Sequence, residues 1–277
     1  MTTEAAIDLL RHDPAFAPTI SSMYLDEDVA AAAARFARSG EFSEVVDLLG
    51  GSLEGRRVLD LGAGTGVASA AFVKAGAKEV IAVEPDPSGL VGHGALRRHC
   101  DDLPVAVVSA LGERLPLADG SVDVVYCRQV LHHMTDLDEA LRECGRVLRP
   151  GGAFLATREH VVDDPGQLEE FLRAHPVHQL AGGEGAYSLD EYERAVRGAG
   201  LTIRRTFGPW DCVINAFPTV EDPAELRRVP SITLAARFGR LGAVMGRAPA
   251  VRQATWRWLR RAKPGRLYSF LAVKPPG

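Results

Sequence analysis

Three glycines at alternating positions, preceded by an acid, form the stretch of this sequence best suited to binding a ligand. Residues 58–66 read VLDLGAGTG, in which Asp60 precedes Gly62, Gly64 and Gly66. Glycine lets the backbone take a positive φ and lie against a ligand without an intervening Cβ. The free N–H groups of the helix expected after Gly66 favour an anionic or carboxylate-bearing group. Asp60 would repel a pyrophosphate but suits a cationic amino group. The stretch therefore predicts a site for a ligand that includes an amino acid.

An acid at the end of the next expected strand indicates a nucleoside. Residues 79–83 read EVIAV, and the run ends at Glu84, Pro85 and Asp86. An acid about 20 residues past a glycine loop accepts hydrogen bonds from two ribose hydroxyls. More than one nucleoside cofactor uses such an acid, so Glu84 does not choose between them. Its structural alternative is a helix N-cap, a role that Asp86 fills better.

The glycine spacing, G-x-G-x-G with Asp60 before it, differs from the G-x-G-x-x-G of dinucleotide-binding proteins. It resembles motif I of the Rossmann-like (class I) S-adenosylmethionine (SAM) methyltransferases. The resemblance continues from residue 56 to about 158 and includes the helix stop LRPGG at 148–152. It implies SAM as the cofactor, with Asp60 facing the methionine amino group and Glu84 the ribose.

The same resemblance implies further cofactor contacts on two loops. Gly112 and Glu113 belong to the segment that lines the adenine in this family, and Cys127 and Arg128 end the expected fourth strand beneath the methionine part. The family commonly has an Asp at the position held here by Leu111. We therefore expect another group to contact the adenine amine.

Histidines and acids near two strand ends are candidates for acid–base chemistry. Methyl transfer to oxygen or carbon often needs a general base, and histidine has a suitable pKa. His160, at the tip of the expected fifth strand, is the first candidate, and Glu159 is the second. Adjacent strand residues point to opposite faces, so only one of the two is expected to face the site. His132, beside His133, is a third candidate, although that position is more often structural in the family.

A loop beyond the fifth strand supplies candidates for binding the acceptor: His175, His178, Glu184 and Tyr187. His175, His178 and Glu184 also have the chemistry of metal ligands. Pro176 argues against a regular helical pair, however, and the spacing fixes no third ligand. The sequence therefore predicts no metal site here.

The charge distribution is uneven. The first 225 residues contain all 36 acids and 20 of the 32 Lys and Arg, and residues 226–277 contain the other twelve bases. This split indicates an anionic partner for the C-terminal region, such as a phosphorylated acceptor held by Arg237 and its neighbours. A membrane surface, a solvated helix face and an acidic surface of the same chain are the alternatives. Nucleic acid is not predicted, because the chain is mildly acidic and carries no such motif.

Composition sets the broad class. A chain of 277 residues with 46% hydrophobic and 25% charged residues suits a globular protein with one large domain. No apolar run approaches a membrane span, and the N-terminal MTTEAAIDLLRHD lacks the features of a signal peptide. The four cysteines have no metal or disulfide spacing. We therefore expect reduced thiols and a cytoplasmic protein.

The elements that must position these residues alternate between short apolar runs and helical patterns. Strands are expected before the glycine loop and at 79–83, 105–108, 122–126, 153–157, 201–207 and 267–273. With the resemblance, they predict an α/β fold: a Rossmann-like, seven-stranded, mostly parallel sheet with N-terminal lid helices and a helical cap inserted before the last, antiparallel strand. The expected domains are a lid over 1–50, a SAM-binding core over 51–210, and the cap insertion with the final strand over 211–277.

Together these features predict SAM-dependent methyl transfer to an oxygen, nitrogen or carbon of a small-molecule acceptor. The segment from Arg158 to Tyr187 and the run VINAFP are similar to methyltransferases of bacterial sugar and secondary metabolism. The alternatives are a decarboxylase or cyclase on the SAM fold, an NAD-dependent oxidoreductase, and a non-catalytic SAM-binding protein. The sequence leaves the acceptor and the oligomeric state open.

Overall fold

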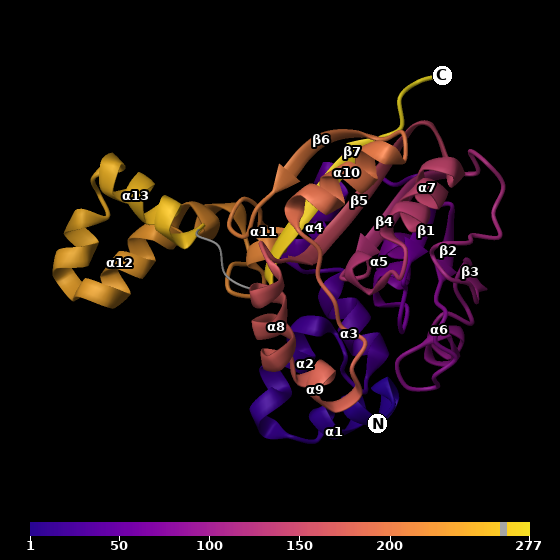
Figure 1. Cartoon of the computed structure of the whole chain (residues 1–277), viewed down its shortest axis with the longest axis horizontal. Helices are drawn as coiled ribbons and strands as arrows, with labels where there is room; N and C mark the ends of the chain where they lie inside the picture. The colour runs from indigo at the N-terminus through magenta and orange to yellow at the C-terminus, as the bar shows by residue number, and fades with distance from the viewer. Residues whose placement is uncertain (261–264) are drawn as a thin grey trace.

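A single seven-stranded sheet organises the chain (Figure 1). The structure is a computed structural model and describes residues 1–260 and 265–277. The strand order is β3-β2-β1-β4-β5-β7-β6, and the pairs are parallel except that β7 runs antiparallel to both neighbours. This topology confirms the predicted fold class. The strands are β1 (Arg57–Leu61), β2 (Glu79–Val83), β3 (Val105–Val108), β4 (Val122–Arg128), β5 (Leu148–Val161), β6 (Thr202–Phe207) and β7 (Arg266–Val273).

Helices connect the strands and cover both faces of the sheet. Several begin at side-chain caps that the sequence shows, among them Asp28 before α3, Ser39 before α4 and Ser188 before α10. The helices of the first half are α1 (Thr3–Arg11), α2 (Ala17–Met23), α3 (Val29–Phe36), α4 (Gly40–Leu48), α5 (Val67–Lys74) and α6 (His93–His99), with short 3-10 turns η1 (Pro14–Phe16) and η2 (Leu131–His133). Those of the second half are α7 (Leu137–Val147), α8 (Pro165–Ala174), α9 (Pro176–Ala181), α10 (Leu189–Gly198), α11 (Val213–Ala216), α12 (Pro223–Met245) and α13 (Pro249–Leu259).

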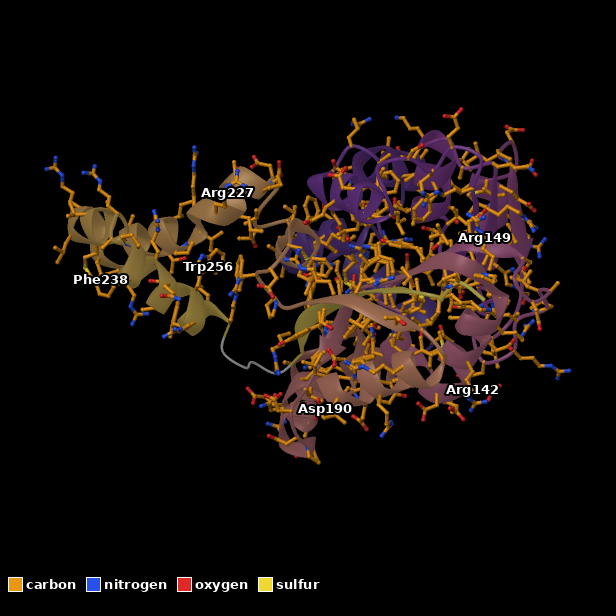
Figure 2. The ribbon with its side chains drawn as sticks, turned by 90° about the horizontal axis from the view of Figure 1, so that it is seen from above. Arg142, Arg149, Asp190, Arg227, Phe238 and Trp256 are labelled. Atoms are coloured by element: carbon orange, nitrogen blue, oxygen red, sulfur yellow. The ribbon has the colours of Figure 1, made fainter. Side chains whose placement is uncertain are left out.

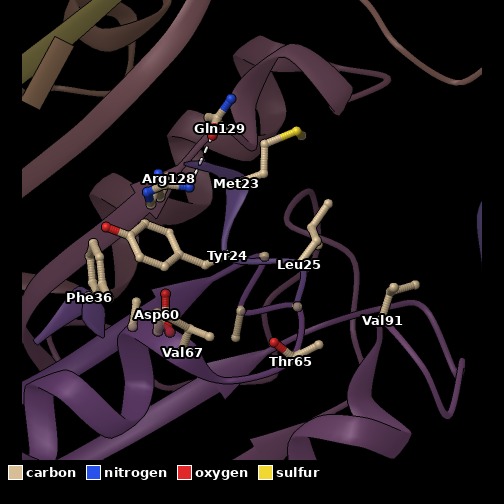
Figure 3. A pocket seen from close by; sticks show the side chains of 14 residues that line it. Met23, Tyr24, Leu25, Phe36, Asp60, Thr65, Val67, Val91, Arg128 and Gln129 are labelled. Carbon is tan, nitrogen blue, oxygen red and sulfur yellow. Dashed lines mark hydrogen bonds between the residues drawn. The ribbon is translucent and has the colours of Figure 1, made fainter. Parts of the chain in front are cut away.

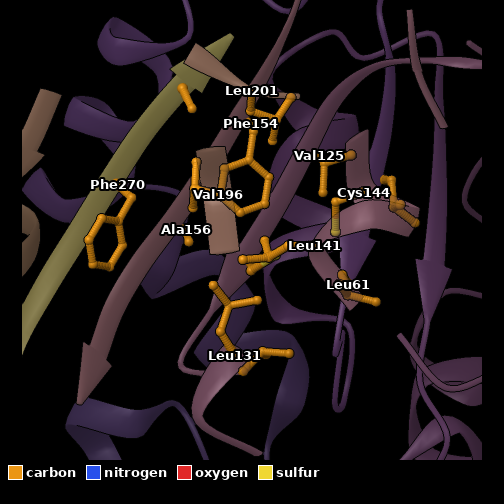
Figure 4. Packing of buried hydrophobic residues seen from close by; sticks show 14 of the residues in the cluster. Leu61, Val125, Leu131, Leu141, Cys144, Phe154, Ala156, Val196, Leu201 and Phe270 are labelled. Atoms are coloured by element: carbon orange, nitrogen blue, oxygen red, sulfur yellow. The ribbon is translucent and has the colours of Figure 1, made fainter. Parts of the chain in front are cut away.

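Strand alternation divides the core into two layers. Leu61 and Val125 pack with Leu141 of α7 and Val196 of α10 on one face of the sheet (Figure 4). Neighbouring positions such as Val58 and Val124 pack on the other face, against α3, α4 and α5. The parity of a residue on β1 or β4 therefore decides which layer it faces.

Strand β5 is longer than the predicted 153–157. Its last residues continue past β4 and pair with β7, so that His160 lies opposite Leu267. The β5–β7 register shifts between Ala156 and Glu159, where Arg158 takes a φ of 60°. Glu159 and His160 follow this irregularity and pair with consecutive residues of β7, so they still alternate with each other, but their register relative to the earlier residues of β5 is shifted.

The N-terminal helices form a layer with α9 at one edge of the sheet. Ile7 of α1 and Ile20 of α2 pack with Val177 of α9 in a small apolar cluster. Residues 175–178, expected as a loop, contain the start of α9, because Pro176 occupies the first helical turn, where its missing N–H costs nothing.

The insertion before the last strand is present but does not cover the sheet edge. Helices α12 and α13 lie between β6 and β7 in sequence and project away from the body (Figures 1 and 2). Figure 2 shows Phe238 far from the body and Trp256 nearer to it. The predicted 211–277 unit includes residues 261–264, which lie outside the described residues. Among the residues that the structure describes, no helix has the length and apolarity needed to cross a membrane.

Candidate functional site

A cavity of about 440 Å³ opens where β1, β2 and β4 end. Gly62 and Gly64 of the glycine loop line it together with Glu84, at the end of β2. A smaller cavity of about 180 Å³ adjoins it and shares Gly62, Gly64 and Arg128 with it. In an α/β sheet this edge is the usual place for a ligand. Residues of the N-terminal segment complete the wall of the larger cavity: Thr3, Ile7, Met23 and Leu25.

The glycine loop brings backbone to the cavity wall. Gly62 has a φ of 68°, and a Cβ there would lie 2.4 Å from Cγ2 of Val130, so no other residue fits without displacing the loop. Gly64 lines both cavities. Gly66 does not line either one; it begins helix α5, and a Cβ there would meet Leu96. Its predicted cofactor contact is therefore replaced by a packing role.

Asp60 lies beneath the glycine loop in the smaller cavity (Figure 3). It is 2% exposed and accepts a hydrogen bond of 2.6 Å from the Ser69 hydroxyl of α5. Burial raises the pKa of Asp60 to about 7. Tyr24 and Phe36 line the same cavity with aliphatic side chains such as Val67, so the carboxyl group faces a small, mostly apolar space. A cationic amino group placed there would stabilise the ionised carboxylate.

Glu84 is the acid at the end of β2, as predicted. Its two oxygens accept hydrogen bonds of 2.9 Å from the N–H groups of Gly64 and Asp86, which holds the carboxylate between the glycine loop and the next turn. Burial raises its pKa. Glu84 and Pro85 both line the larger cavity. A carboxylate has about four acceptor positions, so two remain for hydroxyl groups of a ligand.

The predicted adenine segment also lines the larger cavity. Gly112, Glu113 and Leu111 are all part of its wall. Glu113 accepts a hydrogen bond of 2.9 Å from the N–H of Thr135, which ties this segment to the turn after β4. The Leu111 side chain is mostly exposed, so this position offers apolar surface where relatives commonly have an acid.

The two predicted residues at the end of β4 have different surroundings. Arg128 lines both cavities, and its guanidinium is anchored at 2.8 Å to the buried carboxylate of Glu41 on α4. Cys127 is fully buried in the layer that includes Cys144 of α7, and it lines neither cavity. Consecutive residues of β4 face opposite layers, so the Cys127 side chain is turned away from the cavities, and its predicted cofactor contact stays a prediction.

A polar cluster forms where the turn after β4 meets the loop after α9. The buried carboxylate of Glu159 binds Nδ1 of His132 at 2.7 Å and accepts the N–H of Val130 at 3.0 Å. Although burial opposes ionisation, these bonds lower the pKa of Glu159. His133 and Glu184 line the larger cavity beside this pair. The structure therefore unites two predicted catalytic residues, but Glu159 binds His132 and does not face the cavity.

His160 does not have the surroundings of a general base. It lines neither cavity, and its Nδ1 lies 2.8 Å from the carbonyl oxygen of Gly265. Burial, reinforced by the positive charge that His132 can carry, lowers its pKa to about 3. The prediction that His160 accepts a proton from the acceptor stays untested, but this position does not favour it, because the extended end of β5 carries the ring toward β7 and Phe171.

The structure separates the predicted acceptor-binding residues. Glu184 lines the cavity, and Nδ1 of His175 lies 3.7 Å from Oε1 of Glu184. His178 is outside the cavity wall, and Tyr187 supports that wall from behind by donating a hydrogen bond of 2.7 Å to the carbonyl of Met134. Arg237 lies on the projecting arm formed by α12 and α13, 5.9 Å from the ring centroid of Trp258 and outside the wall of the larger cavity, so its predicted acceptor contact stays a prediction that this position does not favour.

Several wall residues were missed by sequence reasoning. The turn after β4 contributes Gln129 and Met134, and the N-terminal segment contributes Thr3, Met23 and Leu25. The only sequence signal for the N-terminal group was the presence of helices ahead of the first strand. Apolar residues of that kind pack equally well in a core, so their position in the wall follows from tertiary packing.

These residues fit a ligand made of a nucleoside and an amino acid. The backbone at Gly62 leaves no room for a side chain, and Glu84 has acceptor positions left for a ligand. The buried Asp60 accepts a hydrogen bond from Ser69, and among the described residues no cationic side chain that lines its cavity is hydrogen-bonded to it. SAM has a group to match each of these features: its methionine part can lie against the glycine loop, its ribose hydroxyls can donate to Glu84, and its ammonium group can pair with Asp60. A dinucleotide would place phosphate charge near Asp60 and fits less well.

Comparison with known proteins agrees with this geometry. A family model described as a methyltransferase domain matches residues 59–156, which span the glycine loop to the middle of β5. The 27-O-demethylrifamycin SV methyltransferase of Amycolatopsis mediterranei is 34% identical over 165 residues, covering 57% of this chain and 60% of that protein. A tRNA U34 carboxymethyltransferase of Methylococcus capsulatus is 35% identical over 116 residues, 42% of this chain and 36% of that protein. The matched parts thus span 60% and 36% of these two relatives, less than two thirds of either.

A solved structure extends the likeness of fold to nearly the whole chain. Geranyl diphosphate methyltransferase in complex with SAM superposes with a TM-score of 0.59 and 16% identity, covering 96% of this chain and 94% of that one. At this identity the likeness concerns the fold. Sheet order, glycine loop and domain match agree: residues 59–156 form a methyltransferase domain of the Rossmann-like, SAM-dependent kind, within a chain whose fold resembles that of a SAM-bound methyltransferase.

Proposed function

We propose that this protein transfers the methyl group of SAM to a nucleophilic atom of a small molecule that occupies the larger cavity. The observation that carries the proposal is the composition of one cavity wall. It combines the glycine loop and Glu84, which suit a nucleoside cofactor, with His133 and Glu184, which suit a polar acceptor. A cofactor site and an acceptor site in one enclosed space are what a direct transfer requires.

The cofactor residues have distinct tasks in this proposal. Bound SAM supplies a methyl group already activated by its sulfonium. Glu84 accepts hydrogen bonds from the ribose hydroxyls, and Asp60, as carboxylate, holds the ammonium group. The backbone at Gly62 and Gly64 lets the chain approach the methionine part closely. Arg128, kept in place by Glu41, closes the cavity below the N-terminal segment.

The acceptor end aligns the nucleophile. Nδ1 of His133 lies 3.1 Å from the carbonyl oxygen of Gly183, which can only accept, so this nitrogen carries the proton and Nε2 is an acceptor. Burial and the charge of neighbouring His132 lower the pKa of His133, which keeps the ring neutral near pH 7. In the absence of any bound ion, His133 Nε2 and Glu184 can therefore both accept a hydrogen bond from an acceptor hydroxyl, and Ile7 and Leu25 exclude water from the same cavity.

A small molecule is the acceptor class that the cavity favours. Its wall is formed by residues from seven separate segments and is roofed by α1 and the end of α2, a shape suited to enclosing a compact ligand. The relative from Amycolatopsis is named for a rifamycin-type acceptor, which supports the same class. The relative from Methylococcus is named for tRNA, so RNA is the competing acceptor that an experiment must distinguish.

The test supplies the purified full chain with methyl-labelled SAM and, separately, a small-molecule metabolite extract, 27-O-demethylrifamycin SV, and bulk tRNA. We expect label in a low-molecular-weight product and equimolar S-adenosylhomocysteine, with no transfer by the Glu84→Ala variant. Label in tRNA would show that the acceptor is RNA and not a small molecule. Tight binding of NAD without binding of SAM would contradict the proposal altogether.

A further inference from the structure

Two histidines and a carboxylate converge beside the cavity from separate parts of the chain. Nε2 of His132 lies 3.7 Å and Nε2 of His133 lies 3.8 Å from Oε2 of Glu184. One ligand atom from each of the three residues falls within 4.8 Å of the others. The histidines come from η2 after β4, and Glu184 comes from the loop between α9 and α10. Fifty residues separate His133 from Gly183, the loop residue whose carbonyl it contacts.

The loop that carries Glu184 is packed tightly against η2. A Cβ at Gly185 would lie 2.6 Å from the carbonyl oxygen of His132, so the backbones touch at this point. The Glu184 side chain is only 9% exposed. The position of the carboxylate is thus set by backbone packing and not by a freely rotating surface side chain.

Hydrogen bonds on the far side of each ring fix the tautomers. Nδ1 of His132 donates to the carboxylate of Glu159 at 2.7 Å, and Nδ1 of His133 donates to the carbonyl of Gly183 at 3.1 Å. In a neutral ring the other nitrogen, Nε2, then carries a lone pair. Metal-binding histidines commonly have this support, in which a carboxylate or carbonyl accepts the second ring N–H and orients the ligand nitrogen.

The three inward-facing groups do not satisfy one another. Distances of 3.7 and 3.8 Å are too long for hydrogen bonds, and when both rings are neutral their two nitrogen lone pairs face a carboxylate oxygen and repel it. A cation between them removes the repulsion. Ligand atoms bound at about 2.1 Å to one tetrahedral ion stand about 3.4 Å apart, which is close to the spacing found here.

A third histidine faces the same carboxylate. Nδ1 of His175 lies 3.7 Å from Oε1 of Glu184 and is buried without a hydrogen-bond partner among the described residues. A proton on this nitrogen would point toward Oε1 and leave Oε2 directed at the other two histidines. His175 is therefore a positioning residue for Glu184.

We propose that His132, His133 and Glu184 bind a divalent transition-metal ion, with Zn²⁺ as the best match. Two imidazoles and one carboxylate suit Zn²⁺ or Co²⁺, whereas Mg²⁺ and Ca²⁺ prefer oxygen ligands only. Three protein ligands leave a coordination position open. Because His133 and Glu184 line the larger cavity, that position is available to an oxygen-bearing acceptor. Contact between the ion and the acceptor rests on the proposed function, whereas binding of the ion to the protein does not.

The test uses the full chain after removal of metals by a chelator, titrated with Zn²⁺ by calorimetry and with Co²⁺ by absorption. We expect one equivalent of each and a visible Co²⁺ spectrum of a nitrogen–oxygen site. His133→Ala and Glu184→Gln should weaken Zn²⁺ binding at least 100-fold, and Glu159→Gln should weaken it about 10–100-fold by releasing the His132 ring. The matched control is His12→Ala, which removes a histidine that is 67% exposed and outside the cluster.

Each other outcome decides against the site. Equal Zn²⁺ affinity in the His133, Glu184 and His12 variants would overturn it, as would the absence of stoichiometric binding in the wild type. A strong near-ultraviolet thiolate band with Co²⁺ would assign the ion to the buried cysteines instead. Thermal melting without metal shows whether each variant is folded. SAM calorimetry on metal-free protein separates this result from the proposed methyl transfer, because neither His132 nor His133 is assigned to the cofactor.

Discussion

Arg128 at the end of β4 and Glu41 in α4 form an ion pair with a nitrogen–oxygen distance of 2.8 Å, and Glu41 is fully buried. The pair joins the central strand to the N-terminal helices, and the Arg128 guanidinium also lies 5.1 Å from the ring centroid of Tyr24. Arg128 lines both cavities, so this single contact connects the N-terminal layer to the site.

Breaking this pair should destabilise the protein strongly. Glu41→Gln leaves a buried guanidinium without its counter-charge, a change that costs about 3–5 kcal/mol in buried pairs. Urea unfolding measures the effect. The control is Asp26→Asn, which removes the partner of Arg35 in a more exposed pair of 2.6 Å and should cost about 1 kcal/mol or less. Similar losses in both variants would show that burial does not distinguish the two pairs.

Removing the ribose acid should weaken the cofactor. Glu84→Ala deletes charge-assisted hydrogen bonds worth about 1.5–3 kcal/mol each, so SAM affinity measured by calorimetry should fall tenfold or more. Glu79→Ala is the matched control, because Glu79 lies on the same strand but pairs with Arg57 outside the larger cavity. Unchanged SAM affinity in the Glu84 variant would refute the assignment.

Asp60 should make the ligand-free protein less stable as pH rises. Its pKa in the folded state, about 7, is above the ordinary value of 3.8, so between these values the folded state binds a proton that the unfolded chain has released. The free energy of unfolding therefore falls through this window, by a total on the order of 4 kcal/mol. Unfolding curves at pH 4.5 and about 8 should show this loss in the wild type and not in Asp60→Asn. The exposed Asp101→Asn serves as control, and equal pH dependence in all three proteins would contradict the prediction.

Substitutions of His160 and His133 should have different effects on the rate of methyl transfer. His160 is outside the cavity wall and has a pKa of about 3, so His160→Gln should leave kcat within about threefold while lowering the melting temperature. His133→Gln should lower kcat/KM tenfold or more, because it removes an acceptor atom that faces the cavity. Both are measured as S-adenosylhomocysteine formation with the acceptor found in the labelling test. A larger loss in the His160 variant would restore it as the base.

Substituting Arg237, on the arm formed by α12 and α13, should not change the KM for the acceptor. Arg237 contacts the rings of Phe238 and Trp258, at 5.8 and 5.9 Å from their centroids, and no residue after Glu184 lines the larger cavity in the described part of the chain. Arg237→Gln should therefore leave the KM for the acceptor unchanged. A severalfold rise in KM with intact folding would mean that the arm closes over the cavity in solution.

Local patterns in the sequence were enough to predict the sheet and the cofactor end of the site. Apolar runs of four to six residues predicted β2 and β3 at their observed bounds, and Ser188 predicted the start of α10. Asp60 and Glu84 lie a few residues from the loops and strands that position them. Their surroundings therefore follow from the conformation of one strand–loop–helix unit, which neighbouring residues largely determine.

Only the tertiary structure decided the acceptor end. The sequence grouped His175 and His178 with Glu184, and folding does place His175 beside that carboxylate, but it also brings His132 and His133 against it across a long sequence separation. His160 follows a register shift between Ala156 and Glu159, where Arg158 has a positive φ, and strand alternation read from the sequence does not show this shift. The N-terminal roof and the outward course of α12 follow equally from packing between distant segments. Such contacts depend on the free energy of the whole fold, so a pattern read over a few residues does not contain them.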